Sequence, residues 1–414
     1  MTRGGPELSE PSWTGNAACI SSDERNDRSL QSRVALLTNF VPPYRIPVFL
    51  SLARRVESLR IFISTRMEPN RPWPVDFSGL HVELQKSVSI GRNWRHPMGF
   101  TERVYTHFPY ATVAELSRYG PSVTISSEFG FRSLNAALFR SMKSKTRLLI
   151  WATLSEASER NRGKRREILR HLILRVADGV IVNGHSGARY IASFGFPRNR
   201  IFIVPQTIDV KAFEKAPLAR SSEASRRLLF VGQLVPRKGV RPFLEILAEW
   251  CRDHGGERVE FLIAGDGPAK TEIAAVPVPP NLTVKLLGNV AYSDLPGVYA
   301  QAGILAFPTL ADEWGLVVNE GMAAGLPILG SIYSQAVEDL VEEGRHGWTF
   351  AIDQPSEVYS KIDAVFAASE EHLQNLREAA REKAMQLTPS VIADRICDAI
   401  TQVAGLPGHA HARA

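Results

Sequence analysis

The sequence contains few cysteines and no long apolar run. Its 414 residues include three cysteines whose spacing matches neither a zinc site nor a disulfide framework: Cys19, Cys251 and Cys397. No apolar run approaches the roughly 18 residues that a bilayer-spanning helix needs. These absences argue against a disulfide-stapled scaffold and a membrane-spanning segment, and they predict a cytoplasmic protein in a reducing compartment.

The common nucleotide-binding motifs are also absent. The segment from Gly265 to Lys270 begins like a dinucleotide fingerprint, but Lys270 stands at the third glycine position and Pro268 fits the turn poorly. No segment has the G-x-x-x-x-G-K-[ST] pattern of a P-loop. A Rossmann dehydrogenase and a P-loop nucleotidase are therefore not supported. No acid cluster has the spacing of metal ligands, so we expect no metal and no cofactor.

Length and composition predict two domains. The chain exceeds the size at which a single hydrophobic core stops growing, and its 44% apolar and 22% charged residues are ordinary for a globular protein. Residues 1–32 are polar and lack an apolar stretch, so we expect a disordered tail there rather than a signal peptide.

The charge is divided unevenly along the chain. Residues 31–210 carry 27 Lys and Arg against 12 Asp and Glu, whereas residues 211–414 carry 19 against 26. The densest basic cluster, from Arg160 to Arg175, coincides with apolar residues at helical spacing, which predicts a basic amphipathic helix. One interpretation is a solvated helix face; the other is attraction to anionic lipid or to a phosphate-bearing acceptor. Nucleic acid is a poor third alternative, because no aromatic platform or nucleic-acid fold accompanies the charge.

The most informative segment runs from Asp312 to Pro327. A buried-strand pattern, Gly303 to Phe307, precedes it, and helical spacing from Leu316 to Ala324 follows the acids. The acids therefore lie where a strand turns into a helix, which is where ligands bind in open α/β sheets. The free N–H groups of the helix start would favour an anion. A capped helix with solvated acids is the competing interpretation.

A second segment, Leu228 to Val240, has the same design with a basic turn. Arg237 and Lys238 follow a predicted strand and precede a predicted helix, so they could hold a diphosphate. The alternative is an exposed basic turn. Two further strand ends, near Gly265 and Gly288, repeat the pattern and argue for one common cleft.

With these segments in view, the chain resembles the retaining glycosyltransferases of glycosyltransferase family 4. The family's hallmark is an acid, seven intervening residues and a Glu; Asp312 and Glu320 have that spacing, although the family usually has Glu at the first position. The resemblance covers roughly residues 33–405. It implies an α/β structure of the GT-B fold, with two Rossmann-like doubly wound domains facing a cleft.

The resemblance also implies roles for the matching residues. Asp312 or Glu313 would contact the donor sugar, and Lys238 would neutralise the diphosphate of a UDP- or GDP-sugar. Glu320 would hold the ribose hydroxyls. Many relatives have Arg at the position of Gln233, and Arg237 could supply that charge. The full set of donor-side candidates is Gly232, Gln233, Arg237, Lys238, Gly265, Gly267, Asn289, Val290, Asp312, Gly315, Leu316, Val317 and Glu320.

The amino half reads as alternating strands and helices and would bind the acceptor. Relatives often have a His after the strand that corresponds to residues 148–151, but none follows here, so no catalytic His can be carried over. The acceptor-side candidates are Tyr44, Arg45, Glu128 and Glu156. Boundaries are expected at 1–32 for the tail, 33–205 for the acceptor domain, 206–389 for the donor domain, and 390–414 for a terminal helix crossing back to the first domain and a frayed end.

The expected function is transfer of a sugar from a nucleotide-diphosphate sugar to a saccharide or lipid-linked acceptor, with retained configuration and without a metal. Such chemistry belongs to cell-surface polysaccharide or glycoconjugate synthesis, with possible attachment to the inner face of the membrane. The alternative is a non-catalytic nucleotide-sugar-binding or regulatory protein, if Asp312 disables the site. A phosphorylase on the same fold would need a pyridoxal-phosphate lysine site, and none can be located.

Overall fold

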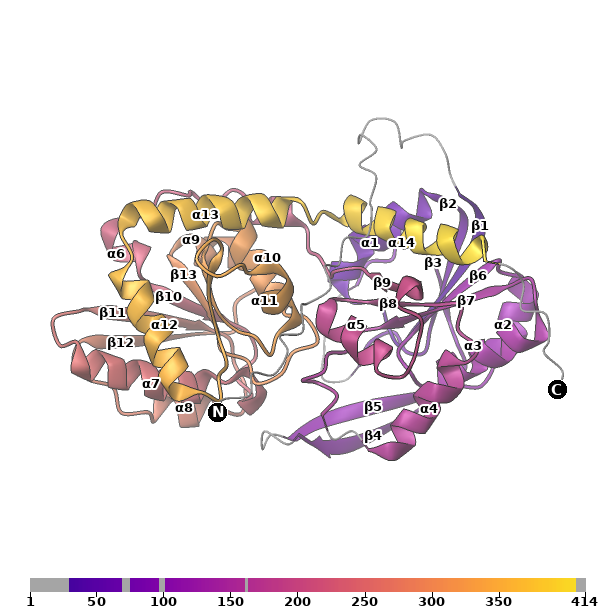
Figure 1. The fold of residues 1–414 in the computed structure, drawn as a ribbon, viewed down its shortest axis with the longest axis horizontal. Coiled ribbons are helices and arrows are strands. Elements are labelled where there is room, and N and C mark those ends of the chain that lie inside the picture. The colour runs from indigo at the N-terminus through magenta and orange to yellow at the C-terminus, as the bar shows by residue number, and fades with distance from the viewer. Residues whose placement is uncertain (1–29, 69–74, 97–100, 161–162, 407–414) are drawn as a thin grey trace, which may run out of the picture.

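The protein has two α/β domains joined side by side (Figure 1). The computed structural model describes residues 30–68, 75–96, 101–160 and 163–406. The expected tail thus lies outside the described residues, except for residues 30–32, which begin the first strand. Each domain is built on a parallel sheet, as the alternating strand and helix patterns predict.

The first domain contains a seven-stranded sheet in which every neighbouring pair is parallel. In spatial order its strands are β3 (His81–Leu84), β2 (Val56–Ile63), β1 (Leu30–Thr38), β6 (Val123–Ser127), β7 (Arg147–Ala152), β8 (Gly179–Val182) and β9 (Ile201–Ile203). Its helices are η1 (Pro43–Arg45), α1 (Ile46–Ala53), α2 (Thr112–Tyr119), α3 (Phe131–Met142), α4 (Lys164–Leu174), α5 (His185–Ala192) and η2 (Arg198–Arg200).

The second domain contains a six-stranded parallel sheet. Its spatial order is β12 (Leu282–Gly288), β11 (Val259–Ala264), β10 (Leu228–Val231), β13 (Ile304–Phe307), β14 (Ile328–Ser331) and β15 (Gly347–Phe350). Its helices are η3 (Val210–Ala212), α6 (Ser222–Ser225), η4 (Pro236–Lys238), α7 (Val240–Asp253), α8 (Lys270–Ala274), α9 (Leu295–Ala300), α10 (Leu316–Ala323), α11 (Gln335–Leu340), α12 (Pro355–Ala367) and α13 (Glu370–Met385).

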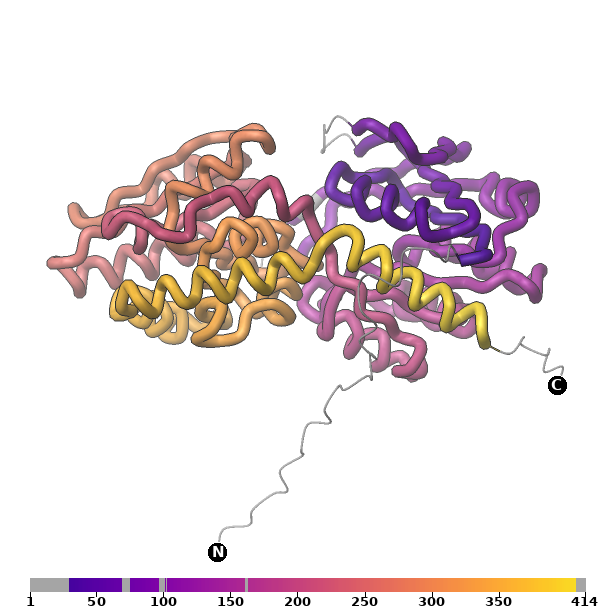
Figure 2. The backbone as a smooth tube through the Cα atoms, turned by 90° about the horizontal axis from the view of Figure 1, so that it is seen from above, coloured from indigo at the N-terminus to yellow at the C-terminus, as the bar shows by residue number. Residues whose placement is uncertain are grey.

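The last helix, α14 (Pro389–Ala404), links the two domains. It follows α13, which packs against α10 of the second domain, and it packs against α1 of the first (Figure 2). Its buried face joins the core cluster that extends through both domains. Because Ile396 and Ile400 are fully buried, replacing either with Ala should cost about 2–5 kcal/mol of folding free energy.

An antiparallel hairpin, β4 (Ser87–Arg95) and β5 (Thr101–Pro109), lies outside both sheets. No helix or strand was expected from the sequence between residues 66 and 122. The hairpin lacks a short turn signal of the Asn-Gly type, and polar residues interrupt its apolar positions. It extends from the first domain toward the second (Figure 1).

The basic helix is shorter than predicted. Arg160 precedes α4, and Arg162 lies outside the described residues. Arg170 is buried, donating to the phenol oxygen of Tyr190 at 2.5 Å and pairing with Glu159, so it belongs to the interior of the domain. The two faces of α4 are thus less cleanly separated than the spacing implied.

Candidate active site

The loops after β10 and β13 are fastened to each other because these strands are neighbours in the sheet. The N–H of Leu310 donates to the carbonyl of Arg237 at 2.8 Å, and the hydroxyl of Thr309 donates to the same oxygen at 3.2 Å. Gly239 has a φ of 67°, and a Cβ there would lie 2.0 Å from the carbonyl oxygen of Pro308. Only glycine fits this approach, which fixes the basic turn against the acidic loop.

The basic turn and the acidic loop form one ion cluster. The Lys238 Nζ donates to Asp312 Oδ2, and Arg237 Nη1 lies 3.5 Å from Asp312 Oδ1 and 3.8 Å from Glu313 Oε2. Asp312 is buried. Burial by itself would raise the pKa of Asp312, but Lys238 and then Arg237 bring it below its ordinary value. Asp312 is therefore a stable carboxylate that positions both cations.

This cluster lies just before the start of α10. Gly315 precedes the helix, and Leu316 and Val317 are its half-buried first residues. A helix start presents backbone N–H groups, and together with two side-chain cations it can accept a diphosphate. The structure thus brings together the residues that the sequence assigned to diphosphate binding.

Glu320, one turn further along α10, is in a different environment. It is buried, and its Oε2 accepts a hydrogen bond from the phenol of Tyr299 at 2.7 Å. Burial raises the pKa of Glu320 to about 7, although the Tyr299 bond acts in the opposite direction. Tyr299, a residue of α9, was not singled out from the sequence because an apolar helix position carries no site signal.

The loops after β11 and β12 lie beside the basic turn. Gly265 has a φ of 153°, and a Cβ there would lie 1.8 Å from the carbonyl oxygen of Gly232. Backbone bonds continue this contact, from the Gly265 N–H to Gly288 at 2.8 Å and from Leu234 to Asp266 at 2.9 Å. Four adjacent strand ends therefore form one edge. Of the other candidates in these loops, Gln233 and Asn289 are exposed, and Gly267 and Val290 are half-buried.

Glu128, an acceptor-side candidate, directly follows β6 in the first domain. Its φ of 64° lies in the left-handed region, which a residue other than glycine rarely adopts. Its Oε1 accepts from the Thr153 hydroxyl and, at 3.1 Å, from the Thr153 N–H. Burial raises the pKa of Glu128 to about 7 despite these bonds and the charge of Arg45. Such a carboxyl group can give or take a proton near neutral pH.

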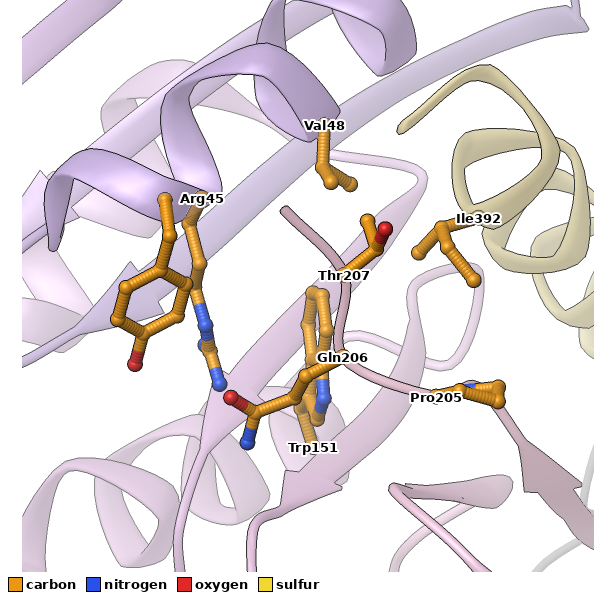
Figure 3. Close-up of a pocket in the computed structure, with 8 residues that line it drawn as sticks. Arg45, Val48, Trp151, Pro205, Gln206, Thr207 and Ile392 are labelled. Atoms are coloured by element: carbon orange, nitrogen blue, oxygen red, sulfur yellow. The ribbon is translucent and has the colours of Figure 1, made fainter. Parts of the chain in front are cut away.

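Two other acceptor-side candidates, Tyr44 and Arg45, line a small pocket beside the interdomain segment (Figure 3). The Arg45 guanidinium carbon lies 4.7 Å from the centre of the Trp151 ring, a cation–π distance. The buried Nε1 of Trp151 has no hydrogen-bond partner among the described residues. The pocket thus offers N–H donors, and its remaining lining residues are Val48, Pro205, Gln206, Thr207 and Ile392.

Glu156, the last candidate, lies at the domain interface. Arg189 donates to it at 2.7 Å and also donates to Glu338 of the second domain at 2.6 Å. Nearby, Asp339 accepts from the backbone N–H of His185 and lies 3.1 Å from its Nδ1. Glu156 therefore takes part in an interdomain ion network.

The first domain also contacts the acidic loop directly, through residues that the sequence did not indicate. The Asn183 side chain donates to the Glu313 carbonyl at 3.3 Å. Gln335 bridges the domains: its Nε2 donates to Glu313 at 2.6 Å and to Leu154 at 2.7 Å, and its Oε1 accepts from Gly187 at 2.9 Å. The position of the acidic loop therefore depends on how the domains meet.

The end of the hairpin reaches this same interface. Trp94 packs with Ala157 of the first domain and with Ala311 of the acidic loop, and His96 Nε2 lies 3.2 Å from the Ala157 carbonyl. The Arg160 guanidinium carbon lies 5.2 Å from the centre of the Tyr333 ring. The site is thus bordered by three parts of the chain: both sheets and the hairpin.

Within the described ranges, no group of three or more His, Cys, Asp or Glu side chains is arranged to hold a metal ion. In the same part of the chain, no helix is both long and apolar enough to cross a bilayer.

A large part of the second domain matches a known family. Residues 225–368 match the model of "Glycosyl transferases group 1". A 122-residue segment is 29% identical to an alpha-D-kanosaminyltransferase from Streptomyces kanamyceticus, covering 29% of this chain and 31% of that protein. The alignments to the first curated relatives span less than half of their length.

The whole fold is shared with solved structures. HepE (Alr3699) of Anabaena, determined with UDP, superposes with a TM-score of 0.66 at 15% identity, over 89% of this chain and all of that one. The lipopolysaccharide outer core galactosyltransferase WaaB superposes with a TM-score of 0.67 at 13% identity, over 89% and 99% of the two chains. The expected GT-B fold is therefore confirmed, and residues 225–368 carry the sequence pattern of group 1 glycosyl transferases within it.

Proposed function

We propose that this protein transfers a glycosyl group from a nucleotide-diphosphate sugar to an acceptor held against the first domain. The observation that carries the proposal is the cluster of Lys238, Arg237 and Asp312 directly before α10, inside the region that matches group 1 glycosyl transferases. HepE has been solved with UDP, and the same fold surrounds the cluster here.

The cluster suggests how a diphosphate would bind. Without a ligand, Asp312 satisfies Lys238 and holds Arg237 nearby. Phosphate oxygens would take over part of these contacts, and the N–H groups at the start of α10 would add to them. As the bond from the sugar to the diphosphate breaks, negative charge grows on the leaving group, and the same groups would stabilise it. This arrangement supports chemistry that needs no metal.

The surroundings of the acidic residues suggest a role for each of them. The low pKa of Asp312 suits a fixed charge beside the donor sugar, with Glu313 as its more exposed neighbour. The buried Glu320 would accept hydrogen bonds from ribose hydroxyls. On the acceptor side, Glu128 is suited to exchange a proton near neutral pH. Retention of configuration, a hexose donor and a saccharide or lipid-linked acceptor of the cell surface complete the proposal.

The test is incubation of the protein with UDP- and GDP-sugars, with and without acceptor extracts, and measurement of released nucleotide and of the product's anomeric configuration. We expect acceptor-dependent release that persists in a chelator, with the donor's configuration kept. Inversion would contradict the retaining part of the proposal, and loss of activity with chelator would contradict the metal-independent part.

The alternative is a nucleotide-sugar-binding or regulatory protein without turnover, favoured by Asp312 in place of the usual Glu. Calorimetric binding of a nucleoside diphosphate together with no release of nucleotide under any acceptor condition would favour that alternative.

A further inference from the structure

Exposed apolar side chains are concentrated in one part of the first domain. Of the 14 large apolar side chains that are exposed among the described residues, nine lie between residues 84 and 172, and five are distributed between residues 278 and 391. Isolated exposed apolar residues need no explanation, but a concentration of them indicates a contact surface.

Seven of these nine lie on three elements that pack together. The hairpin contacts α3, with the rings of Phe108 and Phe131 5.5 Å apart, and α3 contacts α4. Figure 1 shows the hairpin, α3 and α4 together along one side of the first domain. We call this set the apolar surface; its members are Val88, Ile90, Leu134, Leu138, Met142, Ile168 and Leu172.

The local structure explains why these side chains point outward. Val88 and Ile90 are two residues apart on β4, so they share a face of the hairpin, while the intervening Ser89 bonds inward to His107. Leu134, Leu138 and Met142 repeat every four residues along α3 and therefore form one stripe. The opposite face of α3 is buried in the core of the domain, so the core does not need its outward stripe. The strand β4 is exposed along most of its length on both faces, so Val88 and Ile90 are not core residues either.

On α4, the same outward face carries both apolar and basic side chains. Ile168 is 60% exposed and Leu172 is 49% exposed, whereas Ile173 is fully buried on the other face. Lys164 and Arg165 precede them and are exposed. A helix with apolar and basic residues on its outer face is typical of binding in the plane of a membrane interface.

The charge around the apolar surface is strongly positive. Residues 84–172 contain 16 Lys and Arg against six Asp and Glu. Four of these cations are buried inside the domain: Arg132, Arg140, Arg147 and Arg170. Among the described residues of this range, eight exposed cations lie on the three elements or within three residues of them: Lys86, Arg92, Arg95, Arg103, Lys143, Lys145, Lys164 and Arg165.

We propose that the apolar surface and its exposed cations dock the first domain on an anionic lipid bilayer. Charge complementarity selects this occupant, because anionic headgroups attract clustered Lys and Arg and the acyl boundary accepts the apolar side chains. The inference deepens the proposed function, since it gives a lipid-linked acceptor a route to the first domain. Its test does not depend on that function.

The experiment is co-sedimentation of the full chain with vesicles of phosphatidylcholine, or of phosphatidylcholine mixed with phosphatidylglycerol, at low and high salt. We expect binding to the mixed vesicles at low salt and much weaker binding in the other three conditions. Equal binding to both vesicle types would overturn the proposal.

Two double variants separate the apolar and electrostatic parts. Ile168→Gln with Leu172→Gln should weaken binding to mixed vesicles by about tenfold or more, and Lys164→Gln with Arg165→Gln by roughly tenfold or more. The matched controls lie on the second domain: Val278→Gln with Leu287→Gln, and Arg252→Gln with Arg258→Gln. Circular dichroism should show that all four variants fold.

Other outcomes are informative. If the controls weaken binding as much as the test variants, the surface is not specific and the inference is wrong. Light scattering gives a second check of the double variant Ile168→Gln with Leu172→Gln. If this variant converts a dimer into a monomer and leaves vesicle binding unchanged, the inference is also wrong, because a second copy of the chain would then cover the apolar surface. Donor turnover measured on the same proteins tests the proposed function separately, since vesicle binding without turnover would contradict only that function.

Discussion

The two domains place a cation and a carboxyl group at corresponding points of their sheets but use them differently. In each sheet the first strand of the domain has a later strand as its direct neighbour: β6 lies beside β1, and β13 lies beside β10. The loops after these strand pairs carry the cation and the carboxyl group. In the second domain the two loops bring Lys238 onto Asp312. In the first domain Arg45 stacks on Trp151, and Glu128 bonds to Thr153 instead.

This difference moves the two pKa values in opposite directions. Both carboxyl groups are penalised by burial, but nearby cations bring the pKa of Asp312 down, whereas burial carries the pKa of Glu128 up to about 7. The buried carboxyl group that pairs directly with Lys238 has a lowered pKa, whereas the one that accepts hydrogen bonds from the neutral Thr153 has a raised pKa.

The largest expected effect comes from removing the cation in the second domain. Lys238→Ala should lower the free energy of unfolding by about 3 kcal/mol, because it leaves the buried Asp312 with Arg237 alone. Affinity for UDP or GDP should fall by roughly tenfold to hundredfold, the value of one charged contact. Denaturant unfolding and calorimetry measure the two effects.

Lys361→Ala is the matched control for that variant. Lys361 pairs with Glu343 at 2.8 Å near the surface, so its loss should cost less than about 1 kcal/mol and leave nucleotide affinity unchanged. Equal effects of the two substitutions would show that the Lys238 pair is an ordinary surface pair.

The raised pKa values predict a pH-dependent stability. For Glu128 and Glu320 the folded pKa, about 7, lies above the ordinary value of 4.5, so the folded state holds the proton more tightly. The contribution of each protonated group to the free energy of unfolding is fully present below pH 4.5. It is lost as pH rises through 7 and amounts to at most about 3 kcal/mol for each group. Glu128→Gln and Glu320→Gln should each flatten the unfolding profile measured without nucleotide. A profile as steep as the parent's in both variants would refute the assignment.

Changing the carboxyl group in the second domain should have a smaller effect on turnover. Asp312→Asn should lower turnover by roughly tenfold, because the neutral amide no longer holds Lys238 and Arg237. Asp312→Glu restores the charge with one more methylene and should recover part of that loss. Glu313→Gln serves as the neighbouring comparison. Turnover equal to the parent's in all three variants would mean that neither acid contacts the sugar.

The smallest effect is expected at the domain interface. The hydrogen bond to Asp339 raises the pKa of His185, so this contact is complete below the ordinary value of 6.5 and weakens as pH rises through the folded pKa. Because His185 is half-exposed, the free energy of unfolding that this contact contributes should change by less than about 1 kcal/mol over that pH range. In the parent, the rate of backbone hydrogen exchange in α5 should rise with pH by more than the intrinsic pH dependence of amide exchange. In His185→Gln this additional rise should be smaller. His81→Gln, an exposed change on β3, should follow the parent.

The helices and strands around the candidate site could be predicted from the sequence, because they depend on residues that are close to each other along the chain. Apolar periodicity predicted a helix from Leu316 to Ala324, which corresponds to α10, and it predicted a strand before the basic turn and a helix after it, which correspond to β10 and α7. Glycines and charges after the strands marked the edge where Lys238 and Asp312 lie. In parallel sheets the carboxyl ends of neighbouring strands share one edge, so local patterns predicted that these strand ends form one common cleft.

Only the tertiary structure decided which groups meet. The pairs Lys238 with Asp312 and Gln335 with Leu154 join residues 74 and 181 positions apart, and no local pattern records such contacts. The same holds for the inward turn of Arg170, the hairpin at the interface and the burial that raises the pKa of Glu128. The sequence by itself determined where charges lie along each strand and helix. Burial and pairing, which set the free energy of each charge, arose only when distant segments of the chain packed together.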